Sequence, residues 1–374
     1  MESTYDVVVV GSGFGGGVTV CRMAEQGLRR YGPSRSLDIV AARGVVYRIE
    51  PSDGPIDRDA NEAHYGDRRT LVQDDHWFDA VAVGVGCMSV ICTVMLEVKP
   101  KHYLGEVREF HTWDEVRADL IDGEVLRANR HYEVLFSPYA LKHRYPCLVT
   151  TRNYTTNPSR KPLDKRTRNW GVELASAFPL TPHLLNLIVD VKPSLSPWMM
   201  EQAIRALIKK EYDEVSYVEH RGRQPAARIF RRDRGPDGRT PHRSGRGDHL
   251  RGGGVSPRRR RVSSSPISFR FVKASNAYMS VMQGRDTMMI ELIQLSRSDG
   301  GYELDAAYES ALAKLGGRPH WGQVNTLTAC EALLETMYPR YPDWLQVHSE
   351  LNASGVVDSP FTKRVGISTP HFTP

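Results

Sequence analysis

The stretch FDAVAVGVGCMSVICTVMLEVKP, residues 78–100, decides the fold assignment. Its first half is rich in small residues, and Val90 to Val98 then form an apolar run that ends at Lys99 and Pro100. A short run rich in β-branched residues and closed by proline predicts a buried strand. The segment from Gly84 to Ser89 predicts a tight turn into that strand, because glycine reaches backbone conformations that other residues avoid.

Elements on both sides of this stretch extend the prediction. Residues 37–41 and 44–49 alternate apolar and polar positions around a glycine, which predicts a hairpin. Further strands are predicted at 129–139, 147–152, 265–272 and 286–295, and helices at 170–177, 182–191, 197–210, 301–315, 324–337 and 343–351. Strands followed by helices in this order favour an α+β fold with an antiparallel sheet.

The length and composition are those of a globular chain. With 374 residues, 40% of them hydrophobic, the chain is long enough for two domains. No apolar run reaches the roughly 18 residues of a membrane-spanning helix, and the N-terminus has no signal-peptide pattern, so we expect a cytoplasmic protein. The cysteines have no CxxC spacing, which argues against a disulfide framework and against a zinc site: Cys21, Cys87, Cys92, Cys147 and Cys330.

The net charge of +6 comes from one segment. Residues 221–261 contain 14 arginines and 3 aspartates but no lysine or glutamate. The rest of the chain is therefore net acidic, and we expect no nucleic-acid partner. The segment 221–262 is also rich in glycine and proline, so it cannot bury enough apolar surface to offset its ordering entropy. We expect it to be a disordered insert.

Three interpretations of the insert stay open. It could bind phosphate-bearing RNA or lipid through its arginines, or it could be a flexible linker. The third, which we favour, is a frameshift: arginine without lysine, mixed with Gly, Pro, Ser and His, is typical of a GC-rich gene translated in a shifted frame. Resequencing the gene would test this hypothesis.

The N-terminus carries a separate signature. An apolar run at residues 5–10 leads into Gly11, Gly13 and Gly16, a GxGxxG pattern followed by a helical segment. In a Rossmann unit these glycines make the turn, admit the pyrophosphate and allow close packing of helix on strand. Residues 5–28 resemble the opening of flavoproteins of the glucose-methanol-choline type, a group that includes cholesterol oxidases. The resemblance implies a βα Rossmann fragment over residues 1–30 with an ancestral role in binding FAD.

The Rossmann pattern does not continue. A second strand should end in an acidic residue about 20 residues later, where it would bind the ribose. Residues 31–36 instead break the pattern, and the nearest acid, Asp38, belongs to the hairpin that follows. We therefore expect Gly11, Gly13 and Gly16 to lie in a fragment that packs on the rest of the chain without a present cofactor role.

The remainder of the chain resembles a different family. Residues 78–100 and 129–139, the sequence GRPHWG at 317–322 and YPRY at 338–341 are similar to the FAD-linked oxidases of the vanillyl-alcohol oxidase superfamily, in particular the D-arabinono-1,4-lactone and L-gulonolactone oxidases. The resemblance covers residues 37–367 apart from the insert. It implies a truncated FAD-binding domain over 37–100 and an α+β substrate (cap) domain over 101–367.

Cofactor contacts follow from this resemblance. It implies that Gly84, Gly86 and Ser89 bring backbone amides to the flavin and pyrophosphate, whereas a glycine-rich turn without a ligand is the alternative. The family's FAD domain also has an earlier Gly-Gly-His-Ser type loop, which often attaches FAD through its histidine. This sequence contains no such loop.

Catalytic residues follow in the same way. The chemistry implied is hydride removal from a carbinol carbon to flavin N5, with oxygen or another acceptor reoxidising the flavin. Arg270 would contact the substrate, His320 and Trp321 would face the isoalloxazine, and Gln323 would donate a hydrogen bond to a flavin oxygen. Related enzymes commonly have lysine where this chain has Gln323. Polyol oxidases have an acid where it has Ser268.

Structural alternatives exist for both main candidates. His320 could be a histidine bonded to the backbone beside a packed Trp321, and Arg270 could form an ion pair with a carboxylate such as Glu291. The function expected is an FAD-dependent oxidase of a sugar lactone or polyol. The alternatives are an inactive flavoprotein fusion and a sterol oxidase. Peripheral membrane contact is also open, because some aldonolactone oxidases are membrane-associated and an exposed arginine-rich insert favours anionic lipid.

Overall fold

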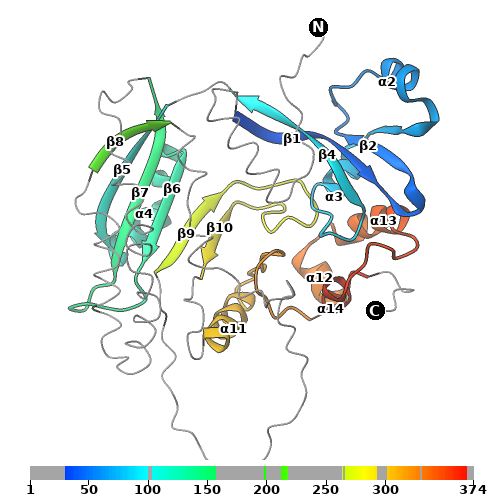
Figure 1. The fold of residues 1–374 in the computed structure, drawn as a ribbon. Coiled ribbons are helices and arrows are strands. Elements are labelled where there is room, and N and C mark those ends of the chain that lie inside the picture. Colours follow the sequence, from blue (N-terminus) through cyan, green and yellow to red (C-terminus); the bar gives the residue numbers. More distant parts are fainter. Residues whose placement is uncertain are drawn as a thin grey trace, which may run out of the picture. The chain divides into compact units, whose positions relative to one another are not determined.

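The computed structural model describes residues 30–99, 103–156, 198, 212–217, 263, 266–292, 301–328 and 331–368. The chain forms two compact units (Figure 1). Unit 1 comprises residues 1–101, 273–287 and 309–374, and unit 2 comprises residues 102–272 and 288–308. The C-terminal helices of the expected substrate domain at 101–367 therefore belong to the same unit as residues 37–100. The expected fragment at 1–30, apart from Arg30, and the insert at 221–262 lie outside the described residues.

Unit 1 contains a four-stranded sheet in the order β3-β2-β1-β4. The strands are β1 (Arg30–Val40), β2 (Val46–Glu50), β3 (Thr70–Gln73) and β4 (Val90–Lys99). Strand β1 is antiparallel to β2 and β4, while β2 and β3 are parallel. The predicted hairpin and the predicted strand after Ser89 are both confirmed.

Alternation along β1 and β2 explains which face of this sheet is buried. Leu37 pairs with Ile49 across the two strands, and both are buried together with Ile39. On the other face Asp38 lies directly opposite Arg48, which donates two hydrogen bonds of 2.6 Å to its carboxylate. Because successive side chains of a strand point to opposite faces of the sheet, one face contributes to the apolar core and the other carries the ion pair.

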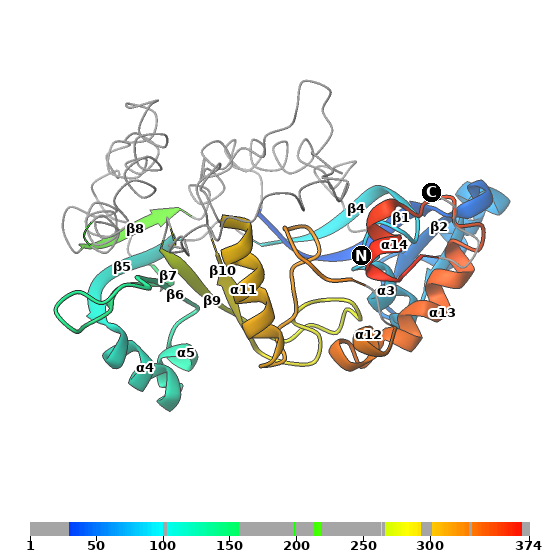
Figure 2. The same cartoon turned by 90° about the horizontal axis from the view of Figure 1, so that it is seen from below.

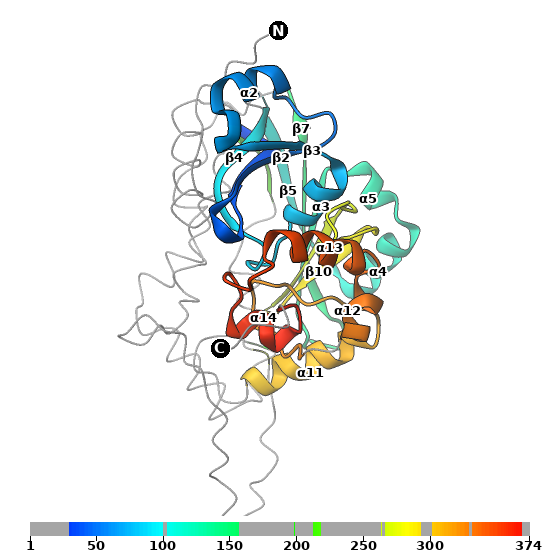
Figure 3. The same ribbon diagram turned by 90° about the vertical axis from the view of Figure 1, so that its right-hand side faces the viewer.

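The helices of unit 1, apart from the first, pack on the apolar core. They are α2 (Arg58–Tyr65), α3 (Asp75–Val81), α12 (Glu331–Met337), α13 (Tyr341–Leu351) and α14 (Pro360–Val365), with short 3-10 turns at Ala42–Gly44 and Gly66–Arg68. Helices α12, α13 and α14 gather next to α3 (Figure 2). Helix α2 lies at the opposite end of the unit (Figure 3). Helix α12 is shorter than the predicted helix at 324–337, whereas α13 begins before the predicted residue 343.

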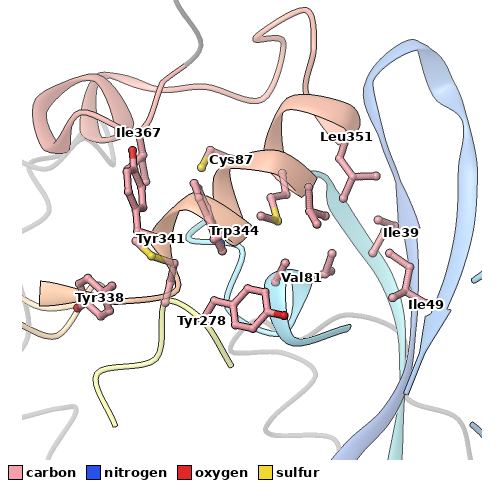
Figure 4. Packing of buried hydrophobic residues seen from close by; sticks show 14 of the residues in the cluster. Ile39, Ile49, Val81, Cys87, Tyr278, Tyr338, Tyr341, Trp344, Leu351 and Ile367 are labelled. Atoms are coloured by element: carbon pink, nitrogen blue, oxygen red, sulfur yellow. The ribbon is translucent and has the colours of Figure 1, made fainter. Parts of the chain in front are cut away.

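Helix α13 provides the centre of the unit 1 core. Its buried positions are spaced by three or four residues, so they form one stripe along the helix: Tyr341, Trp344, Val347, His348 and Leu351. The stripe packs against Ile39 and Ile49 of the sheet and Val81 of α3 (Figure 4).

Unit 2 contains a six-stranded sheet in the order β10-β9-β6-β7-β5-β8. The strands are β5 (Tyr103–Thr112), β6 (His131–Phe136), β7 (Pro146–Thr155), β8 (Tyr212–Tyr217), β9 (Ile267–Val272) and β10 (Thr287–Glu291). The β5, β6, β7, β8 and β9 pairings are antiparallel, as expected of the α+β class.

One face of this sheet is covered by α4 (Trp113–Asp122) and α5 (Glu124–Ala128), which lie together in Figure 2. Val116 of α4 packs with Val134, Val149 and Phe269 of the sheet. The remaining helix, α11 (Gly301–Ala313), begins within unit 2 and ends within unit 1. No helix among the described residues is both long and apolar enough to span a bilayer.

Replacing Trp344 by alanine tests whether α13 organises unit 1. The side chain is fully buried, and its indole Nε1 donates to the Val83 carbonyl at 3.1 Å. We expect Trp344→Ala to lower the free energy of unfolding by about 3–5 kcal/mol, measured by urea denaturation followed by circular dichroism. Val356→Ala, at a side chain that is 69% exposed, should change it by less than about 0.5 kcal/mol. Equal effects of the two substitutions would contradict the assignment.

Candidate functional site

The turn from Gly84 to Ser89 connects α3 to β4 in unit 1. The Cys87 amide donates to the Gly84 carbonyl at 3.0 Å and closes the turn. Val85 and Gly86 both have positive φ, at 50° and 78°, so glycine is the fitting residue at the second position. A Cβ added at Gly86 would meet no atom within 4 Å. The backbone here is open to the close approach of a ligand.

A second turn, from His320 to Gln323, also belongs to unit 1. The Gln323 amide donates to the His320 carbonyl at 3.1 Å. The Gly322 amide donates to Nδ1 of His320 at 3.0 Å, while the His320 side chain is exposed. A ring nitrogen that accepts a hydrogen bond carries no proton, so neutral His320 has its proton on Nε2. His320 therefore presents a hydrogen-bond donor to the exterior.

Trp321 anchors this second turn in the core. Its indole Nε1 donates to the Met279 carbonyl at 2.7 Å. Its ring stacks on Tyr338, with centroids 5.4 Å apart, and the Arg318 guanidinium lies 4.9 Å from the Tyr338 ring centre. The alternative interpretation gives His320 a structural role only, with its ring bonded to the backbone beside a packed Trp321. Both of these features are present. The exposed Nε2 of His320 takes no part in this packing and remains accessible to a ligand.

The two turns are attached to the same segment of chain. Tyr338 contacts Trp321, and the Tyr341 amide donates to the Tyr338 carbonyl at 2.8 Å. Three residues later Trp344 donates to the carbonyl of Val83, directly before the first turn. Residues 338–344, which include the YPRY sequence, thus support both turns.

A loop at residues 274–287 lines an open pocket of about 560 Å³ within unit 1. Arg318 holds this loop through hydrogen bonds to the carbonyls of Gln283 (2.8 Å) and Val281 (3.4 Å). Most residues of the lining carry polar or charged side chains, although the surface includes apolar parts: Arg35, Pro51, Asp75, Phe78, Asp79, Ser275, Asn276, Gln283, Gly284 and Arg340. None of the predicted cofactor-binding or catalytic residues lines it.

Burial in this pocket raises the pKa of Asp79. Burial is the main cause, and Asp75 adds to it, while Arg340 and His76 act in the opposite direction. Arg340 also donates to the Tyr278 hydroxyl at 2.9 Å and lies over the Tyr278 ring. Sequence analysis noted Arg340 within YPRY without assigning it a role. Asp79 gave no signal, because its environment arises from a loop nearly 200 residues away in the chain.

Arg270 lies on β9 of unit 2. Its guanidinium is 3.1 Å from Glu133 on β6 and 3.4 Å from Glu291 on β10. Glu133 also pairs with Arg152 at 2.9 Å, and Arg152 pairs with Glu106 on β5. These side chains form a row of alternating charge across the sheet. The ion pair with Glu291 that sequence analysis weighed as an alternative is present, and the Arg270 side chain remains 49% exposed.

The other predicted positions have simpler surroundings. Ser268 is buried on β9, and Gln323 is exposed in the second turn. Asp38, the nearest acid to the Rossmann pattern, is engaged by Arg48 in the sheet of unit 1. Gly11, Gly13 and Gly16 lie outside the described residues.

Comparisons with known proteins point to one group of enzymes. A family model for D-arabinono-1,4-lactone oxidase matches residues 256–365. The chain is 24% identical to L-gulonolactone oxidase of Bos taurus over 298 residues, which cover 77% of this chain and 62% of that protein. It is 25% identical to L-gulono-1,4-lactone dehydrogenase of Mycobacterium tuberculosis over 323 residues, which cover 80% of this chain and 66% of that protein.

A shorter match links the chain to an oxidase of sugar alcohols. Alditol oxidase of a Streptomyces species is 30% identical over 94 residues, which are 25% of this chain and 22% of that protein. The chain thus spans 62% to 66% of the length of the lactone oxidase and dehydrogenase relatives. The family model covers Arg270, His320, Trp321 and Gln323.

The charge row predicts how acid destabilises unit 2. Burial alone would raise the pKa of Glu133, but Arg152 and Arg270 hold it below its ordinary value of 4.5. A depressed folded-state pKa gives stability that is present above the unfolded pKa and is lost as pH falls. We expect Glu133→Gln to be less stable than wild type at pH 6 and to lose less stability between pH 6 and pH 3.

Urea denaturation at a series of pH values measures this difference. Glu124→Gln, at an exposed carboxyl of α5, should keep the wild-type slope. A Glu133→Gln profile parallel to wild type would show that Glu133 is not the titrating group.

Proposed function

We propose that this protein is an FAD-dependent oxidoreductase that oxidises a CH–OH group of a sugar lactone or polyol. The observation that carries the proposal is the GRPHWG turn, where His320 presents Nε2–H outward from a fixed ring. The comparisons support the same class, because the relatives are named as lactone oxidases, a lactone dehydrogenase and an alditol oxidase.

The residues of unit 1 fit the polar edge of a flavin. Gly86 leaves room for a ligand at the first turn, and Ser89 directly precedes β4. His320 supplies a donor at the second turn, with Trp321 beneath it. When bound, FAD supplies the hydride acceptor at N5. Gly84, Gly86 and Ser89 would hold the cofactor through backbone amides.

The tautomer of His320 favours a role as a hydrogen-bond donor over a role as a general base. A neutral imidazole with Nε2–H donates a hydrogen bond, and it accepts a proton at Nε2 only if the hydrogen bond from Gly322 is broken. His320 is therefore suited to stabilise negative charge that grows on an oxygen or on the flavin edge during hydride transfer. Gln323, which replaces the more common lysine, would add a neutral donor.

Polar surfaces favour a hydroxylated substrate. Arg270 is half exposed among carboxylates of the unit 2 sheet, and the pocket of unit 1 is lined mainly by charged and amide side chains. Such groups match the hydroxyl groups of a sugar lactone or polyol. The sterol alternative would require a large apolar cavity beside His320. Molecular oxygen or another acceptor would complete the cycle.

The amount of FAD bound by the purified protein distinguishes an active oxidoreductase from an inactive flavoprotein fusion. Purified protein should be yellow and should release about one equivalent of FAD on denaturation, or should take up added FAD. Colourless protein that binds no added FAD would refute the proposal and leave the inactive flavoprotein fusion.

Substitution of His320 tests the active edge. We expect His320→Ala to lower kcat about 10²- to 10³-fold with bound flavin unchanged, measured by steady-state turnover with candidate lactones and polyols. His64→Ala, at an exposed histidine of α2 in the same unit, should keep wild-type kcat. Unchanged turnover in His320→Ala would make His320 a structural residue only.

Two glycine substitutions test which turn holds the cofactor. Gly86→Asp introduces a carboxylate at the open position and should abolish flavin binding, because a fixed negative charge repels the cofactor's phosphates. Gly13→Asp should keep flavin if the N-terminal Rossmann fragment has no present cofactor role. Flavin lost in Gly13→Asp and kept in Gly86→Asp would assign the cofactor to the N-terminal glycines.

A further inference from the structure

Three potential metal ligands meet beneath the Gly84 to Ser89 turn. They are Cys87 of the turn, His348 of α13 and Asp358 of the loop before α14, and their ligand atoms all lie within 4.8 Å of one another. The Cys87 residue is 0% exposed and His348 is 1% exposed, and the Asp358 side chain is likewise fully buried. Figure 4 shows Cys87 beside the buried stripe of α13.

The two nitrogens of His348 differ in their surroundings. The ring forms a hydrogen bond with the Cys87 backbone and stacks on Trp344 at a centroid distance of 5.0 Å. Nε2 is buried without a hydrogen-bond partner among the described residues. It points toward Oδ1 of Asp358, 3.8 Å away, and the same oxygen accepts a hydrogen bond from the Asn352 side-chain amide at 3.0 Å. A cation between the imidazole nitrogen and the carboxylate, either a proton or a metal ion, would stabilise this buried pair.

A divalent cation would be compatible with the burial, because its two charges would balance a thiolate and a carboxylate around a neutral imidazole.

The donor set selects the metal. Sulfur and imidazole nitrogen disfavour Mg²⁺ and Ca²⁺ and suit Zn²⁺. With Zn–S near 2.3 Å and Zn–N or Zn–O near 2.0–2.1 Å, tetrahedral ligand atoms lie about 3.3–3.7 Å apart. The spacing from His348 to Asp358 is close to this value. The Cys87 thiol donates a hydrogen bond of 3.5 Å to the Gly84 carbonyl, which it would give up on binding the metal.

We propose that Cys87, His348 and Asp358 form a structural zinc site that fastens the Gly84 to Ser89 turn to α13. The spacing of the cysteines argued against zinc, because the ligands come from three separate elements and no local motif marks them. A cysteine nucleophile activated by His348 is incompatible with the geometry, since no substrate can reach a fully buried sulfur. The site is independent of the oxidoreductase function proposed above.

Binding has a definite proton balance. The Cys87 thiol loses its proton as the Zn–S bond forms. About one proton should therefore be released per metal bound, and affinity should rise with pH.

Cobalt titration of the chelator-treated, full-length protein tests the site. We expect one equivalent of Co²⁺ to give the absorption of a thiolate-bound tetrahedral ion, to be displaced by Zn²⁺, and Zn²⁺ to raise Tm by several degrees. Cys87→Ser and His348→Gln should abolish the signal. Cys92→Ser, at a partly exposed cysteine of β4 in the same unit, should retain it.

Each other outcome counts against the site. Wild-type protein that binds no Co²⁺ or Zn²⁺ at micromolar concentration would overturn the proposal. So would a Cys87→Ser variant, folded by circular dichroism, that binds the metal as wild type does. Cys87→Ser replaces only the buried sulfur by oxygen, so we expect this variant to fold. It therefore tests the site even if His348→Gln fails to fold.

Discussion

The hydrogen bond from the Trp344 indole to the Val83 carbonyl is the interaction on which unit 1 depends. It joins α13, from the C-terminal part of the chain, to the end of α3. The same indole is fully buried against Tyr341 and His348. Burial of this ring alone accounts for about 3–5 kcal/mol. Because the Gly84 to Ser89 turn begins at this contact, the stability of the core also fixes the backbone of the candidate cofactor site.

Unit 2 follows a different principle, in which one sheet face is apolar and the other carries paired charges. Val134 packs toward the helices, while its neighbour Glu133 joins the row that runs from Glu106 through Arg152 to Arg270. Removing Glu133 would take one of two carboxylate partners from the buried Arg152, which keeps Glu106, and one from Arg270, which keeps Glu291. The row therefore constrains Arg270 and leaves it able to meet a ligand only through its exposed half.

Local sequence patterns predicted the elements that depend on local chemistry. The alternation around Gly44 gave the hairpin of β1 and β2, and the apolar run after Ser89 gave β4. Strand β5, by contrast, was not predicted, because Tyr103 to Thr112 alternates polar residues with few large apolar ones. Its pairing with β7 and β8 is settled by partners far away in the chain.

In the candidate site, too, local sequence predicted some features, whereas others depend on contacts between distant segments. GRPHWG identified His320, but its tautomer follows from a turn hydrogen bond that no residue pattern reveals. Asp79 and the group of Cys87, His348 and Asp358 gave no sequence signal, since their environments are assembled from separate elements. Short motifs mark residues whose neighbours are local, and they cannot mark a site that exists only after distant segments pack together.

The packing around Trp321 explains how an exposed histidine can still be well placed. Trp321 is held by the Met279 carbonyl and by the Tyr338 ring, which also contacts Arg318. The Tyr338 hydroxyl is buried without a hydrogen-bond partner among the described residues, so the ring acts here through its shape and its aromatic face. Neighbours of Trp321 therefore determine where the His320 backbone lies, and the Gly322 amide determines which ring nitrogen faces outward. Precision at the candidate site arises from the core beneath it.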